Sequence, residues 1–423
     1  MKTGFVLFLA VSALFMSCVE QSAPDKKVPA SAITQAGFLS TNGKNIANSN
    51  GDNVYLRGVN VGGWLVQEQW MCPVLIHPQE NMRDHKTMLD TLKERFGAEV
   101  RDELIAVYED NYWTETDFDN CASMGMSVIR LPFSYMNLVI LDEGPDFHKL
   151  KPNAFSRFDW FVEEAGKRGI YVILDMHGAF GSQNGKDHSG EINDGWQLYN
   201  DQANMQKTIW LWGEIAKHFN GNPVVAMYDI LNEPGPQART INHVQWNLFD
   251  KIYTEIRKHD PSHIISMESC WDAVHLPRPE QYSWKNVVYQ YHYYDWNNIT
   301  NAEGLNGFTD SKIADIDVGN YNVPTFVGEF TYFDQVSSWD YALNVFNQQG
   351  WHWTSWSHKV MQEMGSWGIY HHNPQRANIQ TDTEQQIREK WSMVGAEYAK
   401  PNPMIKSEIE KKTPYTLSGG STG

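Results

Sequence analysis

Two glutamates at the ends of apolar segments are the side chains of this sequence best suited to acid–base and nucleophilic chemistry. The segment YDILNEPGP, residues 228–236, leads from apolar residues into Asn232 and Glu233 and then into two prolines that stop a strand. The apolar segment 325–329 also ends in a glutamate, Glu329. A pair of carboxyl groups can cleave a glycosidic bond, one as acid and base and the other as nucleophile. Because the two glutamates are far apart in the chain, only the fold can bring them together.

Other polar residues that could serve such a pair also follow apolar segments. Arg130 could hold a carboxylate ionised and oriented, and Asn232 could bind a sugar hydroxyl more strongly in the transition state. His177 and His292 stand at two further segment ends. Alternatives stay open for each residue taken alone: a buried salt bridge for Arg130, a structural role for His177, and a helix cap or surface ion pair for a lone glutamate.

Short apolar segments, separated by stretches long enough for helices, must position these residues. The segments are 54–59, 127–132, 170–176, 224–231, 263–268, 287–292, 325–329 and 351–356. Most of them are continuously apolar, as parallel strands buried on both faces require. Two of the intervening helices are expected at 158–169, ending at the C-cap Gly169, and at 247–260, before Pro261.

Eight strands joined by helices predict an α/β fold, a (β/α)8 TIM barrel that forms a single catalytic domain. Such a barrel carries its chemistry at the carboxyl ends of the strands. The candidate residues stand at these ends, so Glu233 and Glu329 are expected to point into one shared mouth.

The composition indicates a globular protein without a polyanionic partner. Of its 423 residues, 41% are hydrophobic, and 51 acidic against 34 basic side chains give a net charge of −17. Nucleic acid would be repelled before contact, whereas a neutral sugar would not. The 17 tryptophans fill the core or form flat apolar platforms for sugar rings.

The first residues have the anatomy of a bacterial export signal. Lys2 precedes the apolar run 5–15, which is too short to span a bilayer, and LFMSC resembles a lipobox that ends in Cys18. We expect a signal peptide at 1–17 and, at 18–36, a lipidated Cys18 with a flexible tether. The protein would then be a cell-envelope lipoprotein, in the periplasm or at the surface, or a secreted protein. Membrane contact is expected only through this anchor.

The rest of the chain divides into one domain and a tail. The barrel is expected to occupy 37–405, and a loose C-terminal tail is expected at 406–423. Besides Cys18, the chain contains Cys72, Cys121 and Cys270, which lack the spacing of a disulfide framework or a zinc site and are expected to be buried thiols.

Several motifs together resemble glycoside hydrolase family 5, a retaining family with a (β/α)8 barrel. LNEP resembles the acid/base motif and TFVGEF the nucleophile strand, which implies Glu233 as acid/base and Glu329 as nucleophile. The resemblance also implies supporting and sugar-binding roles for further residues. They are Arg130 in IRLPFS, His177 in LDMHG, Asn232 beside the acid/base, His292 and Tyr294 in YHYY, and Trp356 as a platform under the reactive sugar.

Two longer stretches resemble the exo-β-1,3-glucanase group of that family. They are LRGVNVGGWLVQEQWMCP and DMHGAFGSQNGKDHSG, and the match implies that Glu68 helps to hold the terminal sugar. The chain departs from the group at Phe180, where the fungal enzymes have proline, and in HHNPQRANIQ, which matches no part of the family. Loops around the cleft decide between trimming ends and cutting internally, so the linkage and the exo action stay open.

The expected function is that of a retaining glycoside hydrolase of the β-glucosidase type, exo-acting on β-1,3-glucan or related β-glucans, monomeric, with no cofactor and no metal. An endo-β-1,4-glucanase and a β-glucosidase are alternatives within the family. A non-catalytic glycan-binding surface lipoprotein is an alternative from another class. A metal-dependent hydrolase would need closely spaced ligands such as His-x-His on the first strand, and LRGVNVGG contains none.

Overall fold

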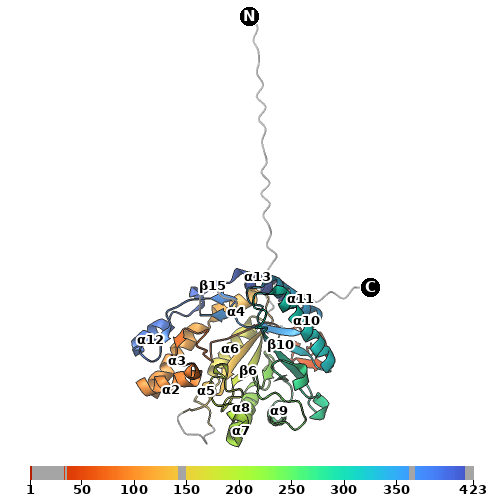
Figure 1. Ribbon diagram of the computed structural model, residues 1–423, viewed down its shortest axis with the longest axis horizontal. Helices are drawn as coiled ribbons and strands as arrows, with labels where there is room; N and C mark the ends of the chain where they lie inside the picture. The colour runs from red at the N-terminus through yellow and green to blue at the C-terminus, as the bar shows by residue number, and fades with distance from the viewer. Residues whose placement is uncertain (2–32, 34–35, 142–148, 362–366, 415–423) are drawn as a thin grey trace.

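The computed structural model describes residues 1, 33, 36–141, 149–361 and 367–414 of the chain (Figure 1). The expected signal peptide and Cys18 lie outside these residues, as does most of the expected tether. Within the described ranges, no helix is long and apolar enough to cross a bilayer.

Eight parallel strands of the described chain close into a barrel. In order around the barrel they are β3 (Arg57–Asn60), β5 (Val128–Ser134), β6 (Tyr171–Gly178), β7 (Val225–Asp229), β8 (Ile264–Glu268), β9 (Val287–Tyr293), β10 (Thr325–Phe330) and β11 (His352–Ser355). β11 pairs with β3 and closes the ring. These are the segments that the sequence singled out, in the predicted order, so the TIM-barrel prediction is confirmed.

Helices surround the barrel and fill the connections between strands (Figure 1). They are α2 (His85–Phe96), α3 (Ala98–Tyr112), α4 (Glu115–Ser123), α5 (Tyr135–Leu138), α6 (Ser156–Lys167), α7 (Gln197–Asn200), α8 (Gln202–Phe219), α9 (Val244–His259), α10 (Ala302–Gly319), α11 (Val336–Gln348), α12 (Glu384–Trp391) and α13 (Pro403–Lys412). Two of them, α6 and α9, are the helices expected from the sequence, and α6 is followed by Gly169 at φ 73° as expected of a C-cap.

Short strands lie outside the barrel. They are β1 (Ser40–Asn42) with β2 (Asn45–Ala47), β4 (Val74–Leu75) with β14 (Ala377–Asn378), and β12 (Lys359–Val360) with β13 (Tyr370–His371) and β15 (Lys400–Pro401). The segment that matched nothing in the family, residues 371–380, therefore forms part of two of these small sheets.

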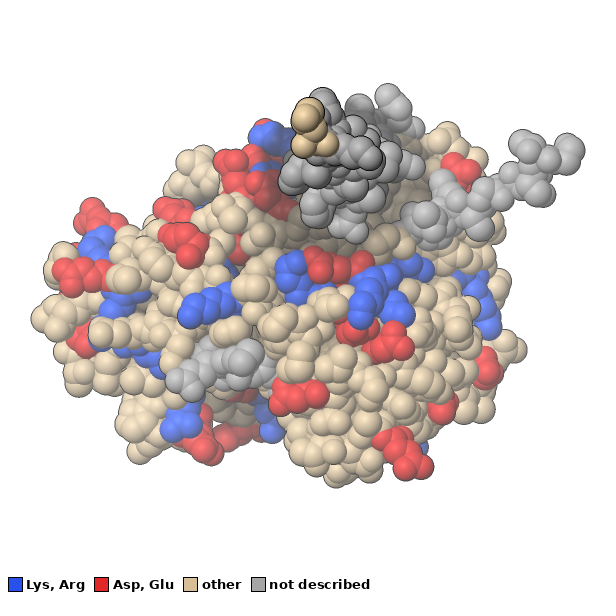
Figure 2. Space-filling view, turned by 90° about the horizontal axis from the view of Figure 1, so that it is seen from above, with Lys and Arg blue, Asp and Glu red and all other residues tan. Residues whose placement is uncertain are grey.

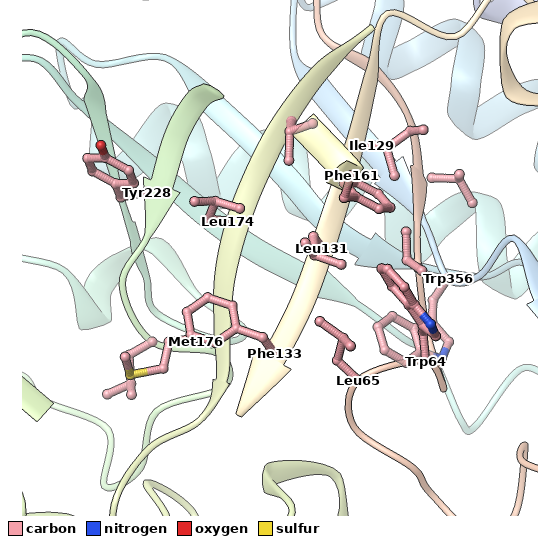
Figure 3. Packing of buried hydrophobic residues seen from close by; sticks show 14 of the residues in the cluster. Trp64, Leu65, Ile129, Leu131, Phe133, Phe161, Leu174, Met176, Tyr228 and Trp356 are labelled. Atoms are coloured by element: carbon pink, nitrogen blue, oxygen red, sulfur yellow. The ribbon is translucent and has the colours of Figure 1, made fainter. Parts of the chain in front are cut away.

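The outward side chains of the strands pack against the helices. On β5, Ile129, Leu131 and Phe133 face outward and join one large buried cluster with Phe161 of α6 (Figure 3). Successive side chains of a strand point to opposite faces, so the alternate residues of β5 face the barrel interior. A change of register by one residue would exchange the two sets, and this fixes the inward position of Arg130.

The inward side chains form two layers. A second apolar cluster seals the base of the barrel beneath the hairpin β1–β2, and it includes Leu56, Val128, Ile173, Met227, Ile264, Val288 and Phe326. Two residues further along three of these strands come Arg130, Asp175 and Asp229, which are fully buried. The barrel interior is therefore apolar at its base and charged towards the carboxyl ends of the strands.

The prediction of a loose tail from Lys406 onward is wrong for residues 406–412, which belong to α13. Asn402 caps this helix by accepting from the backbone N–H of Met404, and Ile405 and Ile409 are buried on one face. Because Lys and Glu residues dominate the segment, the two apolar residues Ile405 and Ile409, one helical turn apart, give no clear helical pattern in the sequence.

Candidate active site

Arg130 lies inside the barrel and binds two aspartates of neighbouring strands. Its Nε donates to Oδ2 of Asp229 at 2.8 Å, and its Nη2 lies 3.1 Å from Oδ1 of Asp175. Burial lowers the pKa of Arg130, but the carboxylates of Asp175, Asp229 and Glu329 outweigh burial and raise it above the usual value. The guanidinium is therefore a permanent positive charge beneath the mouth of the barrel.

The same guanidinium reaches residues at the strand ends. Nη1 donates to Oε1 of Glu329 at 2.8 Å and to Oδ1 of Asn60 at 3.0 Å, and Nη2 donates to Oδ1 of Asn232 at 2.9 Å. The hydroxyl of Tyr294 donates to Oε2 of Glu329 at 2.9 Å. Both carboxylate oxygens of Glu329 thus accept hydrogen bonds from fixed donors, which hold the carboxylate in one orientation.

Glu233 stands just beyond β7 in the left-handed backbone region, at φ 41°. This conformation costs a residue other than glycine about 1–3 kcal/mol, and its backbone N–H is held by Oε2 of Glu268 at 2.9 Å. The side chain lies between two imidazoles: Oε1 is 2.9 Å from Nδ1 of His292, and Oε2 is 3.0 Å from Nε2 of His188.

Two opposing effects act on the pKa of Glu233. Burial raises the pKa of Glu233, but the charge and hydrogen bond of His188, together with His292, outweigh burial and bring it well below its usual value. Glu268, beneath Glu233, has its pKa raised well above the usual value, chiefly by burial and then by the charge of Glu233. These surroundings favour the ionised form of Glu233 and the protonated form of Glu268 in the free protein.

The two candidate carboxylates face each other across the mouth. One oxygen of Glu233, one of Glu329 and a ring nitrogen of His292 all lie within 4.8 Å of one another. Retaining glycosidases place their two carboxyl groups about 5 to 5.5 Å apart, and inverting enzymes place them about 6.5 to 9.5 Å apart. The spacing here belongs to the shorter class.

His177, Trp356 and Asn232 lie in the same mouth. The rings of His177 and Trp356 stack at 5.4 Å and 10°, and Nδ1 of His177 lies 2.8 Å from Oδ2 of Asp175. Burial lowers the pKa of His177 to about 3, so the ring is neutral. The buried amide nitrogen of Asn232 has no hydrogen-bond partner in the described part of the chain, which leaves a donor beside Glu233.

Glu68 follows β3 and faces the same space. Its Oε2 accepts from Nε1 of Trp70 at 2.7 Å, and only 5% of the residue is exposed. Burial raises the pKa of Glu68 to about 8, and the charges of His188 and Glu329 act on it as well. Below that pH the carboxyl group can both donate and accept a hydrogen bond. The structure thus brings together every barrel residue that the sequence singled out.

An aromatic wall borders the mouth on the side of Glu329, and the sequence reasoning singled out only one of its members, Tyr294. The wall consists of Trp70, Trp271, Tyr294, Trp296 and Trp367, whose neighbouring rings lie 5.1 to 6.5 Å apart. Trp296 is 57% exposed and Trp271 is 37% exposed, so both present ring surface to solvent. Trp296 follows Tyr294 by two residues, which is a signal that could have found it.

Three polar residues around the site also escaped selection from the sequence. Asp229 and Glu268 end apolar strands, and the rule that found Arg130 applies to them as well. His188 lies in a short 3-10 turn, η2 (Asp187–Ser189), where no periodicity marks it.

Glu233, His292 and Glu329 also form the one group of ligand-type side chains, within the described ranges, that is close enough to hold a metal ion. A cation bound there would share Glu329 with the guanidinium of Arg130, 2.8 Å from its Oε1. Like charges so close in a buried site repel strongly. The donor set therefore suits a neutral ligand better than a cation.

Comparisons with known proteins agree with this geometry. Among curated proteins, the chain is 30% identical to a beta-xylosidase of Phanerodontia chrysosporium, over 61% of this chain and 52% of that protein. It is 31% identical to a glucan 1,3-beta-glucosidase of Blumeria graminis, over 47% of this chain and 45% of that protein. The chain thus spans about half the length of the curated relatives it matches.

A solved structure shares the fold. The rutinosidase from Aspergillus niger matches with a TM-score of 0.59 at 17% identity, over 80% of this chain and 98% of that one. The model of the family described as cellulase (glycosyl hydrolase family 5) matches residues 91–362, more than half of the chain. The chain therefore belongs to glycosyl hydrolase family 5.

Proposed function

We propose that the protein is a retaining glycosidase that removes glucose units from the ends of β-1,3-glucan or related β-glucans. The observation that carries this proposal is the pair of opposed carboxylates, with oxygens within 4.8 Å of each other. One of them is bound by an arginine and a tyrosine, and the other lies between two imidazoles. This asymmetry suits one carboxylate to attack and the other to proton transfer.

In the first step, Oε2 or Oε1 of Glu329 attacks the anomeric carbon while Glu233 donates a proton to the leaving oxygen. Arg130 and Tyr294 hold Glu329 in place for this attack. In the second step, Glu233 takes a proton from water, and the water oxygen displaces Glu329 from the sugar.

The terminal sugar would be held by side chains that can still donate or accept a hydrogen bond. Among the described residues, the amide nitrogen of Asn232 and Nε2 of His177 have no hydrogen-bond partner. These two groups and the carboxyl group of Glu68 offer hydrogen bonds to hydroxyls, and Trp356 offers an apolar face. The names of the relatives, which include glucan 1,3-beta-glucosidases, support β-1,3-glucan. The aromatic wall supports binding of the rest of the substrate chain.

The test of the proposal is Glu329→Gln, which keeps the shape of the side chain and removes the nucleophile. We expect kcat on an aryl β-glucoside to fall by roughly four orders of magnitude or more, with an unchanged circular dichroism spectrum. Near-normal turnover by the variant would contradict the assignment.

The products of the wild-type protein identify the substrate. Release of glucose alone from laminarin supports exo action on β-1,3-glucan, and oligosaccharides from carboxymethylcellulose would instead identify an endo-β-1,4-glucanase. Hydrolysis of short aryl glucosides only would identify a β-glucosidase. An aryl xyloside belongs in the same panel because one relative is named a beta-xylosidase. Sugar binding without any product would leave the glycan-binding lipoprotein as the function.

We also propose that the protein is exported and anchored through Cys18, as a monomer. The support is the order of Lys2, the apolar run 5–15 and the LFMSC motif in the sequence. Incorporation of a labelled fatty acid into the protein in cells tests the anchor, and a protein left unlabelled would contradict it. Sedimentation of the purified protein tests the oligomeric state.

A further inference from the structure

His188 places a second imidazole on Glu233, from an element outside the barrel strands. It lies in η2, in the connection that follows β6, and its Nε2 is 3.0 Å from Oε2 of Glu233. The side chain is 29% exposed, so it lies at the rim of the mouth. No role was expected for this residue from the sequence.

The contacts of His188 determine which partner its Nε2 bonds to in each protonation state. Nε2 also lies 2.9 Å from Nδ2 of Asn184, an amide whose orientation is fixed because its Oδ1 accepts from the backbone N–H of Lys186 at 2.9 Å. A single ring nitrogen donates or accepts, but does not do both. A protonated Nε2 donates to Glu233, and Asn184 then donates only to the backbone carbonyl oxygen of Glu233, at 3.2 Å. A bare Nε2 accepts either from Asn184 or from a protonated Glu233.

Charged groups on every neighbouring element favour a proton at this position. Glu233 approaches from the connection after β7, Glu68 from the connection after β3, and Asp187 from the turn itself, with its Oδ1 3.8 Å from Nδ1 of His188. The nearest imidazoles are His177 on β6, which is neutral, and His292 beyond Glu233. Carboxylates thus dominate the surroundings.

Burial lowers the pKa of His188, but the charges of Glu233, Glu68 and Asp187 and the hydrogen bond to Glu233 outweigh burial and raise it to about 9. The same contact lowers the pKa of Glu233. Two groups that interact so strongly titrate as a pair, and the pair holds one proton until the higher of its two apparent pKa values is passed.

We infer that His188 is a positioning residue that stores the donor proton for Glu233 and so extends proton donation to the leaving group into alkaline solution. The inference rests on the proposed glycosidase function. In the first step the proton passes from Nε2 of His188 to Oε2 of Glu233 and on to the leaving oxygen. The bond from that oxygen to the anomeric carbon breaks, and Glu329 forms the new bond to carbon.

The second step restores the starting state. Attack by water releases a proton to Glu233, and this proton returns to Nε2 of His188 while the bond to Glu329 breaks. His188 therefore ends each cycle with the same proton count with which it began.

The experiment compares wild type with His188→Asn by the pH profile of kcat/KM on two β-glucosides. One has a poor leaving group, such as 4-methoxyphenol, that needs a proton, and the other has 2,4-dinitrophenolate, which leaves without one. Asparagine can still donate a hydrogen bond to Glu233, but it cannot store a proton. We expect the alkaline limb for the poor leaving group to move down by about one pH unit or more, and the activity on the dinitrophenyl substrate to change by less than about threefold.

His218→Asn serves as the matched control. This histidine lies in the last turn of α8, where it stacks on Phe155 and pairs with Asp159 at 2.6 Å, and its loss should leave both profiles unchanged. Circular dichroism and thermal melting check that each variant is folded.

The outcomes separate this inference from the proposed function. An unchanged alkaline limb in a folded, active His188→Asn variant overturns the inference and leaves the glycosidase function intact. An equal loss on both substrates at every pH also overturns it, because it indicates a role in sugar binding or in structure. Failure of the wild type to hydrolyse any glycoside overturns the proposed function itself.

Discussion

At the scale of single residues, the two carboxylates of the mouth differ in which partners fix them. Glu329 receives hydrogen bonds from a guanidinium and a phenol, groups that do not titrate near neutral pH. Glu233 is bound by two imidazoles, a type of side chain that can take up and release a proton. A nucleophile must keep its charge, and a proton donor must exchange its proton, so the partners match the two proposed roles.

The acid/base role of Glu233 predicts a distinctive response to Glu233→Ala. The variant should lose most activity on a substrate with a poor leaving group, and it should still form the glycosyl-enzyme from a dinitrophenyl glucoside. Azide, a small nucleophile that needs no base, should then raise kcat by about tenfold or more and give a β-glucosyl azide.

Nuclear magnetic resonance of the product measures this outcome. An α-glucosyl azide, or the absence of any rescue, would contradict the double-displacement mechanism with Glu233 as acid and base. The same treatment of Glu329→Gln supplies the control, since azide cannot form the β-product there by the same route.

At the scale of elements, the alternation of strand residues decides which side chains reach the mouth. Arg130 faces inward because Ile129 and Leu131 face outward against the helices (Figure 3). The apolar pattern of the strands could be recognised in the sequence. The barrel and the placement of polar residues at the strand ends could be predicted from that pattern. The roles of Glu268 and His188 could not be predicted, because they depend on neighbours that the fold brings together from distant parts of the chain.

The helix α13 shows why the C-terminal segment was misread. Its sequence is rich in Lys and Glu, and its buried residues are the apolar Ile405 and Ile409 together with Glu408. Two apolar residues one turn apart are too few for a periodic signal, and the helix is stabilised by tertiary contacts instead. One such contact is the ion pair of Lys412 with Asp340 of α11, at 2.7 Å.

Truncation of the buried side chain Ile409→Ala should therefore destabilise the whole barrel. We expect the free energy of unfolding to fall by about 2–5 kcal/mol, measured by urea denaturation followed by tryptophan fluorescence. The exposed neighbour Lys411→Ala provides the control, with a change of about 0.5 kcal/mol or less. Equal stability of Ile409→Ala and wild type would show that α13 contributes nothing to the fold.

At the scale of the whole molecule, charge is spread widely outside the barrel and concentrated within it. On the face shown in Figure 2, acidic and basic side chains are interspersed, and the chain carries a net charge of −17. Inside, Glu68 and Glu268 have pKa values raised chiefly by burial. The folded protein therefore keeps protons that the unfolded chain would lose near pH 4 to 5.

This protonation predicts how stability depends on pH. The folded-state pKa of Glu68 is about 8, above the value of 4.5 for an unperturbed glutamate, so its contribution is lost as pH rises from the lower value to the higher one. Between pH 4.5 and 8 the free energy of unfolding should fall, and Glu68→Gln should make that fall shallower. Thermal melting across this range measures both slopes. Parallel slopes for variant and wild type would contradict a buried, protonated Glu68.

The apolar cluster at the base of the barrel affects the order in which parts of a substrate enter and leave the mouth. It fills the far end of the barrel with Leu56, Val128, Ile173 and other apolar side chains, so a sugar can approach Glu233 and Glu329 only from the carboxyl ends of the strands. A glucose unit that enters first comes to rest deepest and must leave last, after the remainder of the chain has departed. During that interval an alcohol bound at the mouth competes with water for the sugar that is attached to Glu329. Concentrated substrate should therefore yield elongated oligosaccharides alongside glucose.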